Sequence, residues 1–255
     1  MKIEGCIFHI TAGGWGQVKA VVLAGGFGTR LQSVLKGLPK PMAPVGEGCF
    51  LDYLLKGLIS SGIKEYIFCV YYLADKITGY LGDGGKLGIS VDYSVETRPM
   101  GTAGAVGLLR ESLKETFCVV NADTYIEVDL RECLQWHREK KAMATLCAVK
   151  VADSGRFGTL VFDSRWRIID FREKAASGGN RWINGGIYIF EPEIFQYIPE
   201  GTSVSMEREV FPRLLKSRER IYGYPRETHF FDIGVPEDYY AFQEFISWKR
   251  EKGDI

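Results

Sequence analysis

The chain has 255 residues, of which 46% are apolar and 25% charged, and its 32 basic and 32 acidic side chains give a formal net charge of zero. This composition supports a full hydrophobic core and excludes a largely disordered chain. Balanced charge argues against a dedicated nucleic-acid or anionic-membrane binder, and no apolar run approaches the roughly 20 residues that span a bilayer. We therefore expect neither nucleic acid nor membrane as a partner.

Residues 1–17 differ from the rest of the chain. They contain a short apolar patch at residues 7–10 and then a glycine-rich stretch, and the patch is shorter than the apolar region of a secretory signal. We interpret these residues as a non-core N-terminal extension and expect that translation begins near Val18. We expect residues 18–255 to form a single domain.

Strands and helices alternate through the first half of this domain. Apolar runs predict strands, and apolar residues at helical spacing predict helices. The expected strands are residues 18–23, 66–72, 89–95, 117–121 and 144–151, and the expected helices are residues 50–59, 75–81, 102–113 and 130–140. Thr102 is expected to cap its helix. This alternation predicts an α/β fold with a doubly wound, mostly parallel central sheet.

Strands predominate in the second half, where residues 159–162, 167–171 and 183–190 are expected to be strands with few helices between them. We expect these strands to form an antiparallel extension of the sheet that carries the acceptor-binding wall. Helices are expected over residues 206–215 and 236–248, and the second has a proline in its first turn.

The six cysteines show no CxxC spacing. Cys69, Cys118 and Cys147 lie inside apolar, strand-like runs, which is typical of buried thiols rather than of metal ligands or disulfides. Together with the lack of a secretory signal, this pattern favours a cytoplasmic protein.

The most informative segment begins where the first strand ends. The apolar residues 20–23 are followed by Gly-Gly-Phe-Gly-Thr at residues 25–29 and then by Arg30. A glycine loop after a buried strand exposes backbone N–H groups, which bind anions. Lys40 stands between two prolines, which restrict the backbone around it. The alternative is a tight turn with a solvated arginine, but the fixed lysine favours a polyphosphate that is attacked as well as held.

Two common nucleotide-binding motifs do not fit this segment. A dinucleotide-binding G-x-G-x-x-G would need glycine at Leu31, and the acidic residue about 20 positions on, Asp52, lies inside an amphipathic helix. The P-loop pattern G-x-x-x-x-G-K-[ST] does not occur in the chain. A Rossmann oxidoreductase and a P-loop NTPase are therefore disfavoured.

Two aspartates end apolar runs. Asp123 follows the strand at residues 117–121, and Asp232 follows two phenylalanines and precedes Gly234. Ligand sites of open α/β sheets lie at the carboxyl ends of strands, where a carboxylate can hold Mg²⁺ between phosphates. The alternatives are a turn or helix cap for Asp123 and a buried carboxylate satisfied by backbone donors for Asp232.

Taken together, these residues resemble the sugar-1-phosphate nucleotidylyltransferase family. The matching segments run in order over residues 18–245 and are residues 23–31, 39–41, 82–84, 96, 101–104, 121–123, 173–174, 184–188 and 231–234. Residues 30–34 and 38–45 most resemble the branch of D-glycero-α-D-manno-heptose 1-phosphate guanylyltransferases. The chain has Arg-Leu-Gln-Ser-Val where Arg-Leu-x-Pro-Leu-Thr is common, which argues against the glucose-1-phosphate thymidylyltransferase branch. Ala122 stands where the family usually has glycine.

The resemblance implies a GT-A-like nucleotide-diphospho-sugar transferase fold with Mg²⁺ as cofactor. It implies transfer of a nucleoside monophosphate from GTP to D-glycero-α-D-manno-heptose 1-phosphate, which releases pyrophosphate and forms GDP-heptose. The implied roles are catalytic for Arg30 and Lys40, nucleotide-binding for Leu23, Ala24, Gly25, Gly26, Gly28, Thr29, Glu96, Gly101 and Thr102, sugar-phosphate-binding for Gly158, Glu173, Lys174, Asn184 and Gly185, and metal-binding for Asp123 and Asp232.

Glu96 bears on the choice of base. Guanine presents two adjacent donors, which one carboxylate accepts together, whereas uracil and thymine present a single donor between two acceptors. A glutamate at the base position therefore favours GTP. The alternative is that Glu96 is a solvated acid at the end of a strand.

Other activities stay open at this stage. They are guanylyl transfer to mannose 1-phosphate, uridylyl transfer to N-acetylmuramate 1-phosphate or a hexose 1-phosphate, and binding of nucleotide sugars without catalysis. The heptose assignment rests on resemblance rather than on pocket chemistry. No covalent intermediate is needed, so none of the three histidines has to act, and His137 is expected to be solvated on a polar helix. The sequence leaves open whether the chain forms a homo-oligomer.

Overall fold

A computed structural model describes residues 18–35, 37–152, 154–155, 157–172 and 181–254. The N-terminal extension proposed for residues 1–17 lies outside the described residues, as do Glu173 and Lys174.

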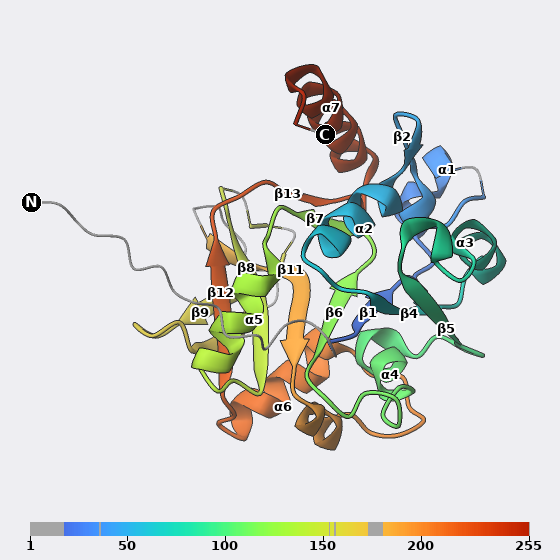
Figure 1. The fold of residues 1–255 in the computed structure, drawn as a ribbon. Helices are drawn as coiled ribbons and strands as arrows, with labels where there is room; N and C mark the ends of the chain where they lie inside the picture. The colour runs from blue at the N-terminus through green and yellow to red at the C-terminus, as the bar shows by residue number, and fades with distance from the viewer. Residues whose placement is uncertain (1–17, 36, 153, 156, 173–180, 255) are drawn as a thin grey trace, which may run out of the picture.

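A nine-stranded sheet forms the centre of the protein (Figure 1). Seven strands follow the order β10-β9-β11-β6-β1-β4-β5, β8 also pairs with β11, and β12 pairs with β8. Their bounds are β1 (Ala20–Leu23), β4 (Glu65–Val70), β5 (Ser90–Val95), β6 (Phe117–Asn121), β8 (Ala144–Val151), β9 (Thr159–Phe162), β10 (Ile168–Arg172), β11 (Arg181–Phe190) and β12 (Ile221–Arg226).

One half of the sheet, β6-β1-β4-β5, is parallel and covered on both faces. Consecutive residues of β1 point to opposite faces, as the strand period of two requires. Val22 packs in the core that contains α2 (Phe50–Ser60), α3 (Ala74–Leu81) and α5 (Leu130–Glu139). Val21 packs in the core that contains α4 (Gly101–Gly107) and α6 (Phe211–Lys216). The prediction of a doubly wound α/β sheet is confirmed.

The other half is largely antiparallel, as expected for the second half of the chain. β11 runs antiparallel to β6 on one side and to β8 on the other, and its register with β8 shifts between Asn184 and Tyr188. Such a shift re-aims the side chains around it, here in the middle of β11. The strand β12, which pairs in parallel with β8, was not expected from the sequence.

A second small sheet, also not expected, pairs β13 (Phe230–Asp232) antiparallel with β7 (Thr124–Ile126). Its register places Asp232 opposite Thr124, and the N–H of Ile233 donates to the carbonyl of Asp123 at 3.0 Å. Three-residue strands are too short to show a period of two in the sequence. This sheet brings the two candidate metal ligands together.

Two expected helices differ in detail from the structure. The helix expected from residue 102 begins at Gly101 and ends at Gly107, and Thr102 does not cap it. The Thr102 hydroxyl donates instead to Glu207 Oε2 at 2.9 Å. The helix expected over residues 206–215 begins as a π-helical turn, Met206–Val210, and continues as α6.

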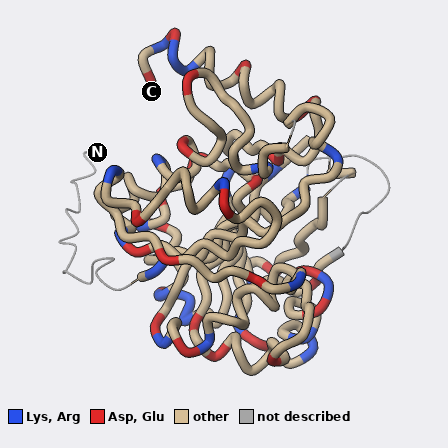
Figure 2. Tube along the Cα trace, turned by 90° about the vertical axis from the view of Figure 1, so that its right-hand side faces the viewer, with Lys and Arg blue, Asp and Glu red and all other residues tan. Residues whose placement is uncertain are grey.

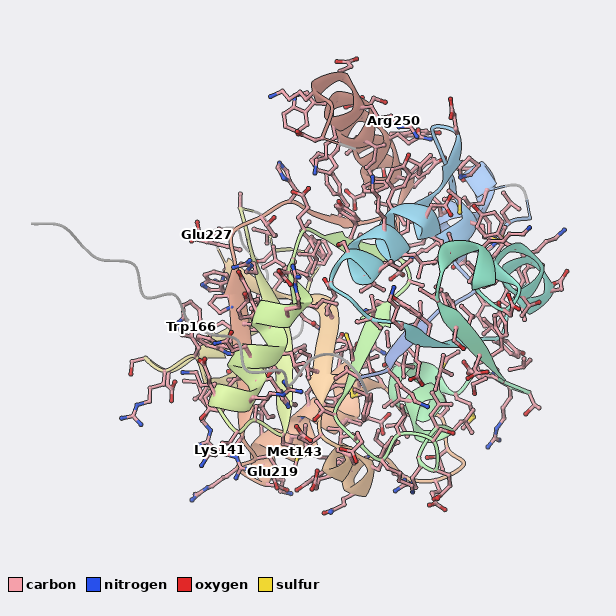
Figure 3. The ribbon with its side chains drawn as sticks, in the orientation of Figure 1. Lys141, Met143, Trp166, Glu219, Glu227 and Arg250 are labelled. Atoms are coloured by element: carbon pink, nitrogen blue, oxygen red, sulfur yellow. The ribbon has the colours of Figure 1, made fainter. Side chains whose placement is uncertain are left out.

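The C-terminal helix α7 (Pro236–Lys252) stands at the top of the molecule in Figure 1. Its apolar residues Tyr239, Phe242 and Ile246 join a third core cluster with Phe50 of α2. Arg250, labelled in Figure 3, donates to the Tyr53 hydroxyl at 2.7 Å and so ties the end of α7 to α2.

His137 is fully buried, so the expectation of a solvated histidine is wrong. Its Nδ1 lies 2.8 Å from Thr145 Oγ1 and its Nε2 lies 3.0 Å from Glu191 Oε1. This contact with His137 holds the pKa of Glu191 below its usual value. The spacing of the buried residues of α5, Leu130, Cys133, Leu134 and His137, shows the helical period that identifies the buried face.

The cysteines behave as expected. Cys69, Cys118 and Cys147 are buried, and the five cysteines in the described part of the chain are free thiols. In the Cα trace of Figure 2, basic and acidic residues are interspersed along the described chain. Within the described ranges, no helix is long and apolar enough to cross a membrane.

Candidate active site

The glycine loop leaves the carboxyl end of β1, as the sequence predicts. Gly28 has a left-handed backbone with φ of 58°, which turns the chain into a 3₁₀ helix at Thr29–Leu31. A Cβ atom on Gly28 would lie 3.3 Å from Lys40 Cγ, so the loop runs against the stem of the lysine. A Cβ atom on Gly25 would lie 2.9 Å from Glu96 Oε1. Both glycines therefore allow close approach to predicted site residues.

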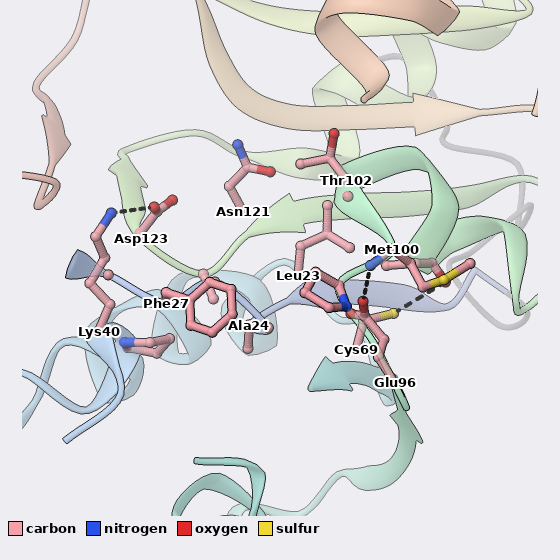
Figure 4. Close-up of a pocket in the computed structure, with 18 residues that line it drawn as sticks. Leu23, Ala24, Phe27, Lys40, Cys69, Glu96, Met100, Thr102, Asn121 and Asp123 are labelled. Carbon is pink, nitrogen blue, oxygen red and sulfur yellow. Dashed lines mark hydrogen bonds and ion pairs between the residues drawn. The ribbon is translucent and has the colours of Figure 1, made fainter. Parts of the chain in front are cut away.

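A first cavity opens over this loop (Figure 4). Its walls include nearly all of the residues assigned to the nucleotide, namely Leu23, Ala24, Gly25, Gly26, Gly28, Glu96, Gly101 and Thr102, together with Lys40 and Asp123. Thr29 and Arg30 are not part of its walls. Figure 4 shows Lys40 and Asp123 at one end of the cavity and Glu96 with Met100 at the other. The cavity thus has a charged end and a separate end lined by a buried carboxylate.

Glu96 is almost fully buried, with 8% of its surface exposed, so it is not the solvated acid that the sequence left open. Its Oε2 accepts the N–H of Met100 at 2.8 Å, and this bond fixes the turn that precedes α4. Burial raises the pKa of Glu96 above its ordinary value. A buried carboxylate in a cavity wall is suited to accept hydrogen bonds from a ligand.

Lys40 and Asp123 form an ion pair, with Nζ 2.6 Å from Oδ2. The lysine starts a 3₁₀ helix, Lys40–Met42, directly after the extended Pro39, and its side chain is 12% exposed. The flanking prolines therefore hold Lys40 in a partly buried position, as the sequence analysis proposed. Such a fixed cation differs from the mobile lysines of an ordinary surface.

Asp232 completes a cluster of two acids and two bases. Burial and the neighbouring Asp123 raise the pKa of Asp232 to about 6, although Lys40 and Arg30 act in the opposite direction. A Cβ atom on Gly234 would lie 2.9 Å from Asp232 Oδ1 and 3.2 Å from an Arg30 guanidinium nitrogen. The structure therefore brings together the four charged residues that the sequence singled out.

The two aspartates fit a divalent cation. Oδ1 of Asp232 is buried and has no hydrogen-bond partner among the described residues. An added positive charge would also relieve the repulsion that raises the pKa of Asp232. No cluster of three or more His, Cys, Asp or Glu ligands exists in the described part of the chain. Two carboxylates suit Mg²⁺, which usually takes one or two from the protein and the rest from phosphates and water.

A second cavity lies on the other side of Asp123. Its walls are Asn121, Asp123, Thr124, Phe157, Gly158, Phe171, Asn184, Gly186, Ser205, Glu207, Arg208, Phe230 and Asp232. Gly158 and Asn184, predicted to contact the sugar, line it. Gly185 does not, because its Cβ position faces the core, 2.5 Å from Ile126 Cδ1. Asn121 and Asp123 line both cavities, so the two spaces meet there.

The sequence analysis missed several residues of the second cavity. Ser205, Glu207 and Arg208 come from the π-helical turn and the residue before it. Phe157 and Phe230 pack edge to face, with 5.3 Å between ring centroids. One signal was present in the sequence, since charged residues interrupt the apolar pattern of the helix that begins at Met206. The phenylalanines gave no signal that distinguishes a cavity wall from a core.

Comparison with known proteins places this geometry in a family. The model of the family described as nucleotidyl transferase matches residues 19–248. The chain belongs to the nucleotidyl transferase family. The resemblance found in the sequence is thereby confirmed, and the sheet described above is the fold of this family.

The chain is similar to several guanylyltransferases of this family. It is 37% identical over 230 residues to the D-glycero-α-D-manno-heptose 1-phosphate guanylyltransferase of Aneurinibacillus thermoaerophilus, with 89% of this chain and 97% of that protein covered. It is 39% identical over 225 residues to the mannose-1-phosphate guanylyltransferase of Mycobacterium tuberculosis, with 88% of this chain but only 63% of that protein covered.

Among solved structures, the chain is similar to HddC from Yersinia pseudotuberculosis, with a TM-score of 0.80 and 31% identity over 90% of this chain and 99% of that one. The same protein complexed with GMP-PN gives a TM-score of 0.79.

Proposed function

We propose that the protein transfers the guanylyl group of GTP to a sugar 1-phosphate and that the sugar is D-glycero-α-D-manno-heptose. The observation that carries this proposal is the meeting of the two cavities at Asn121 and Asp123, beside the fixed Lys40. A reaction between two bound substrates needs such a junction, where the reacting groups are held in contact.

In the proposed reaction, an oxygen of the sugar phosphate attacks the α-phosphorus of GTP. A bond forms between that oxygen and the α-phosphorus. The bond from the α-phosphorus to the oxygen that bridges the α- and β-phosphates breaks, and pyrophosphate leaves. The loop at residues 25–28 would hold the triphosphate through its backbone N–H groups. Lys40 and Arg30 would stabilise the charge that develops on the phosphates, and no protein nucleophile is required.

Asp123 and Asp232 would hold the Mg²⁺ ion of the reaction. When bound, the ion supplies charge neutralisation for the phosphates. The two carboxylates would place the positive charge of the ion at the junction of the two cavities, because both line the second cavity and Asp123 also lines the first. Lys40 pairs with Asp123 and balances the charge of this carboxylate.

The base and the sugar are supported by different observations. Glu96 is buried at the far end of the first cavity, where its carboxylate would accept the two adjacent donors of guanine. The heptose rests on the comparisons, since the chain covers nearly the whole length of the heptose 1-phosphate guanylyltransferases it matches. Mannose 1-phosphate is the second candidate, because the mannose-1-phosphate guanylyltransferase of M. tuberculosis is 39% identical.

A pyrophosphate-release assay tests the proposal. The protein is incubated with Mg²⁺, each of GTP, UTP, ATP and dTTP, and each of the heptose, mannose, glucose and N-acetylmuramate 1-phosphates. We expect the highest kcat/KM for GTP with the heptose substrate. Highest turnover with UTP would contradict GTP as the nucleotide substrate, and highest turnover with mannose 1-phosphate would contradict the heptose as the acceptor. Binding of GTP without turnover of any substrate pair would indicate a non-catalytic protein.

A further inference from the structure

Gln32 stands between the two segments that form the charged end of the first cavity. The glycine loop precedes it in the chain, and the segment that carries Lys40 follows it. The motif of residues 30–34, which resembles one branch of the family, has Gln32 at its centre. The reaction proposed above assigns no role to this side chain.

The side-chain amide of Gln32 joins these two segments. Its Nε2 lies 3.3 Å from the carbonyl oxygen of Phe27, in the glycine loop, and 3.4 Å from that of Leu38, two residues before Lys40. Because both neighbours are acceptors, the nitrogen and not the oxygen of the amide must face them. An amide NH₂ group carries two donors, so one side chain can bond both carbonyls at once.

The backbone of Gln32 is held in place by the core. Gln32 begins α1 (Gln32–Leu35), and its N–H donates to the carbonyl of Thr29. The flanking Leu31 and the last residue of the helix, Leu35, are buried in the third core cluster. The amide therefore reaches the glycine loop from a packed support.

The bond to Phe27 sets the direction of the N–H that follows it. The C=O of Phe27 and the N–H of Gly28 belong to one planar trans peptide and point in opposite directions. The carbonyl points to Gln32, which is not part of the cavity wall, whereas Gly28 lines the cavity (Figure 4). Gln32 thus fixes the orientation of one of the N–H groups proposed to hold the triphosphate.

The ring of Phe27 restricts the same peptide. Its centroid lies 5.6 Å from the ring centroids of both Tyr71 and Tyr72, which follow β4. Glycines on both sides of Phe27 give the backbone a freedom that would otherwise let this peptide rotate. The ring and the Gln32 amide together therefore hold one conformation of the loop.

The bond to Leu38 acts on the lysine. The carbonyl of Leu38 belongs to the peptide bond with Pro39, whose extended backbone leads directly into Lys40. Since proline fixes its own φ, the orientation of this peptide largely determines where Lys40 begins. One amide group thus restrains both the loop that would hold the triphosphate and the cation beside it.

We propose that Gln32 is a positioning residue, which sets the place of Lys40 relative to the glycine loop through its two hydrogen bonds. The proposal rests on the proposed function, because it requires the loop and Lys40 to act on the same triphosphate. A misplacement of about 1 Å can cost about 100-fold in rate, so a side chain that touches no substrate can still decide turnover.

A variant without the donors tests the proposal. Gln32→Met keeps the length of the side chain but has no N–H group. We expect its dissociation constants for GTP and for inorganic tripolyphosphate, measured by calorimetry with Mg²⁺, to rise about 10-fold, as loss of two partly buried hydrogen bonds predicts. Binding of guanosine, which has no phosphate, should not change.

A control and a double variant separate positioning from general structural support. Gln135→Met removes a surface hydrogen bond to Glu139 at 2.8 Å and should bind all three ligands like the wild type. In the Lys40→Ala background, Gln32→Met should raise the dissociation constant of GTP by only about 3-fold or less, because the lysine that the amide positions is absent.

Three results would overturn the inference. They are a Gln32→Met variant that binds GTP like the wild type, a variant that loses affinity for guanosine and GTP equally, and a loss that is the same with and without Lys40. If Gln32→Met does not fold, Gln32→Leu, which also lacks the donors, is measured in its place. A wild type that binds GTP but turns over no substrate pair contradicts the proposed function instead, and these binding constants still decide the role of Gln32.

Discussion

The two cavities that meet at Asp123 are built in different ways. The walls of the first come from loops at the carboxyl ends of β1, β5 and β6, three strands of the parallel half of the sheet. Because the carboxyl ends of parallel strands lie at one edge of the sheet, their loops are neighbours, and short sequence motifs are enough to identify this cavity. The second is assembled from the antiparallel half, the small β7–β13 sheet and a π-helical turn, which lie far apart in the sequence. Contacts between distant segments, rather than motifs, define its shape.

The charged junction between the cavities is expected to give the largest effects. Lys40→Ala and Asp123→Ala should each lower kcat/KM by at least about 100-fold, as loss of one electrostatic stabiliser does in other enzymes. Steady-state kinetics of pyrophosphate release measure this loss. Lys150→Ala, which breaks a surface pair with Glu227 at 2.8 Å, is the matched control and should keep wild-type kinetics. Near-normal turnover in either junction variant would contradict the catalytic assignment.

Replacement of Glu96 is expected to change the choice of nucleotide but not the binding of the sugar 1-phosphate. In Glu96→Gln the amide oxygen can still accept the Met100 N–H, so the turn is kept, but one acceptor for guanine becomes a donor. The preference for GTP over UTP should fall by about 1–3 kcal/mol. Competition between the two nucleotides at fixed sugar 1-phosphate measures it. Unchanged discrimination would remove Glu96 from base recognition.

A glycine in each cavity separates the two binding functions. In Gly25→Ala the new Cβ would lie 2.9 Å from Glu96 Oε1, and we expect KM for GTP to rise by about 10-fold. In Gly186→Ala, at φ of 76°, the Cβ would lie 2.6 Å from Thr124 Oγ1, and KM for the sugar 1-phosphate should rise instead. Gly57→Ala, whose Cβ meets nothing within 4 Å, is the control. If both site variants raise both KM values equally, the cavities do not act separately.

The effect expected for Asp232 without metal is on stability. Its pKa is raised to about 6, so between the ordinary value near 3.8 and 6 the folded protein binds more protons than the unfolded chain. The free energy of unfolding should therefore fall as pH rises through this window. Without metal at pH 8, Asp232→Asn should be more stable than wild type by roughly 1–3 kcal/mol, and the difference should disappear near pH 4.

Denaturant unfolding in EDTA at several pH values checks this expectation. Asp92→Asn, a change at an exposed position of β5, serves as the control. Mg²⁺ should stabilise the wild type more than Asp232→Asn, because the variant has lost a ligand. A variant that is less stable than wild type at pH 8 without metal would contradict the repulsion between the two aspartates.

The same contrast explains what could be predicted from the sequence. The glycine loop, Lys40 and the doubly wound sheet follow from local patterns, since backbone freedom, proline restriction and apolar periodicity act within a few residues. The position of Glu207 and the exclusion of Gly185 from the cavity depend on a register shift in β11 and on a helix that packs across α4. Neither feature can be identified from the local sequence. The polarity of His137 indicates a solvated residue, whereas its helical spacing with Leu130, Cys133 and Leu134 places it on the buried face of α5.

The account depends on a reaction at the junction of the two cavities, and transfer of a labelled phosphorus tests it most directly. The wild-type protein is incubated with Mg²⁺, GTP labelled at the α-phosphate and D-glycero-α-D-manno-heptose 1-phosphate. We expect the label to be recovered in GDP-heptose, with one equivalent of unlabelled pyrophosphate released. Label that stays in GTP, although the protein binds both substrates, would contradict the account.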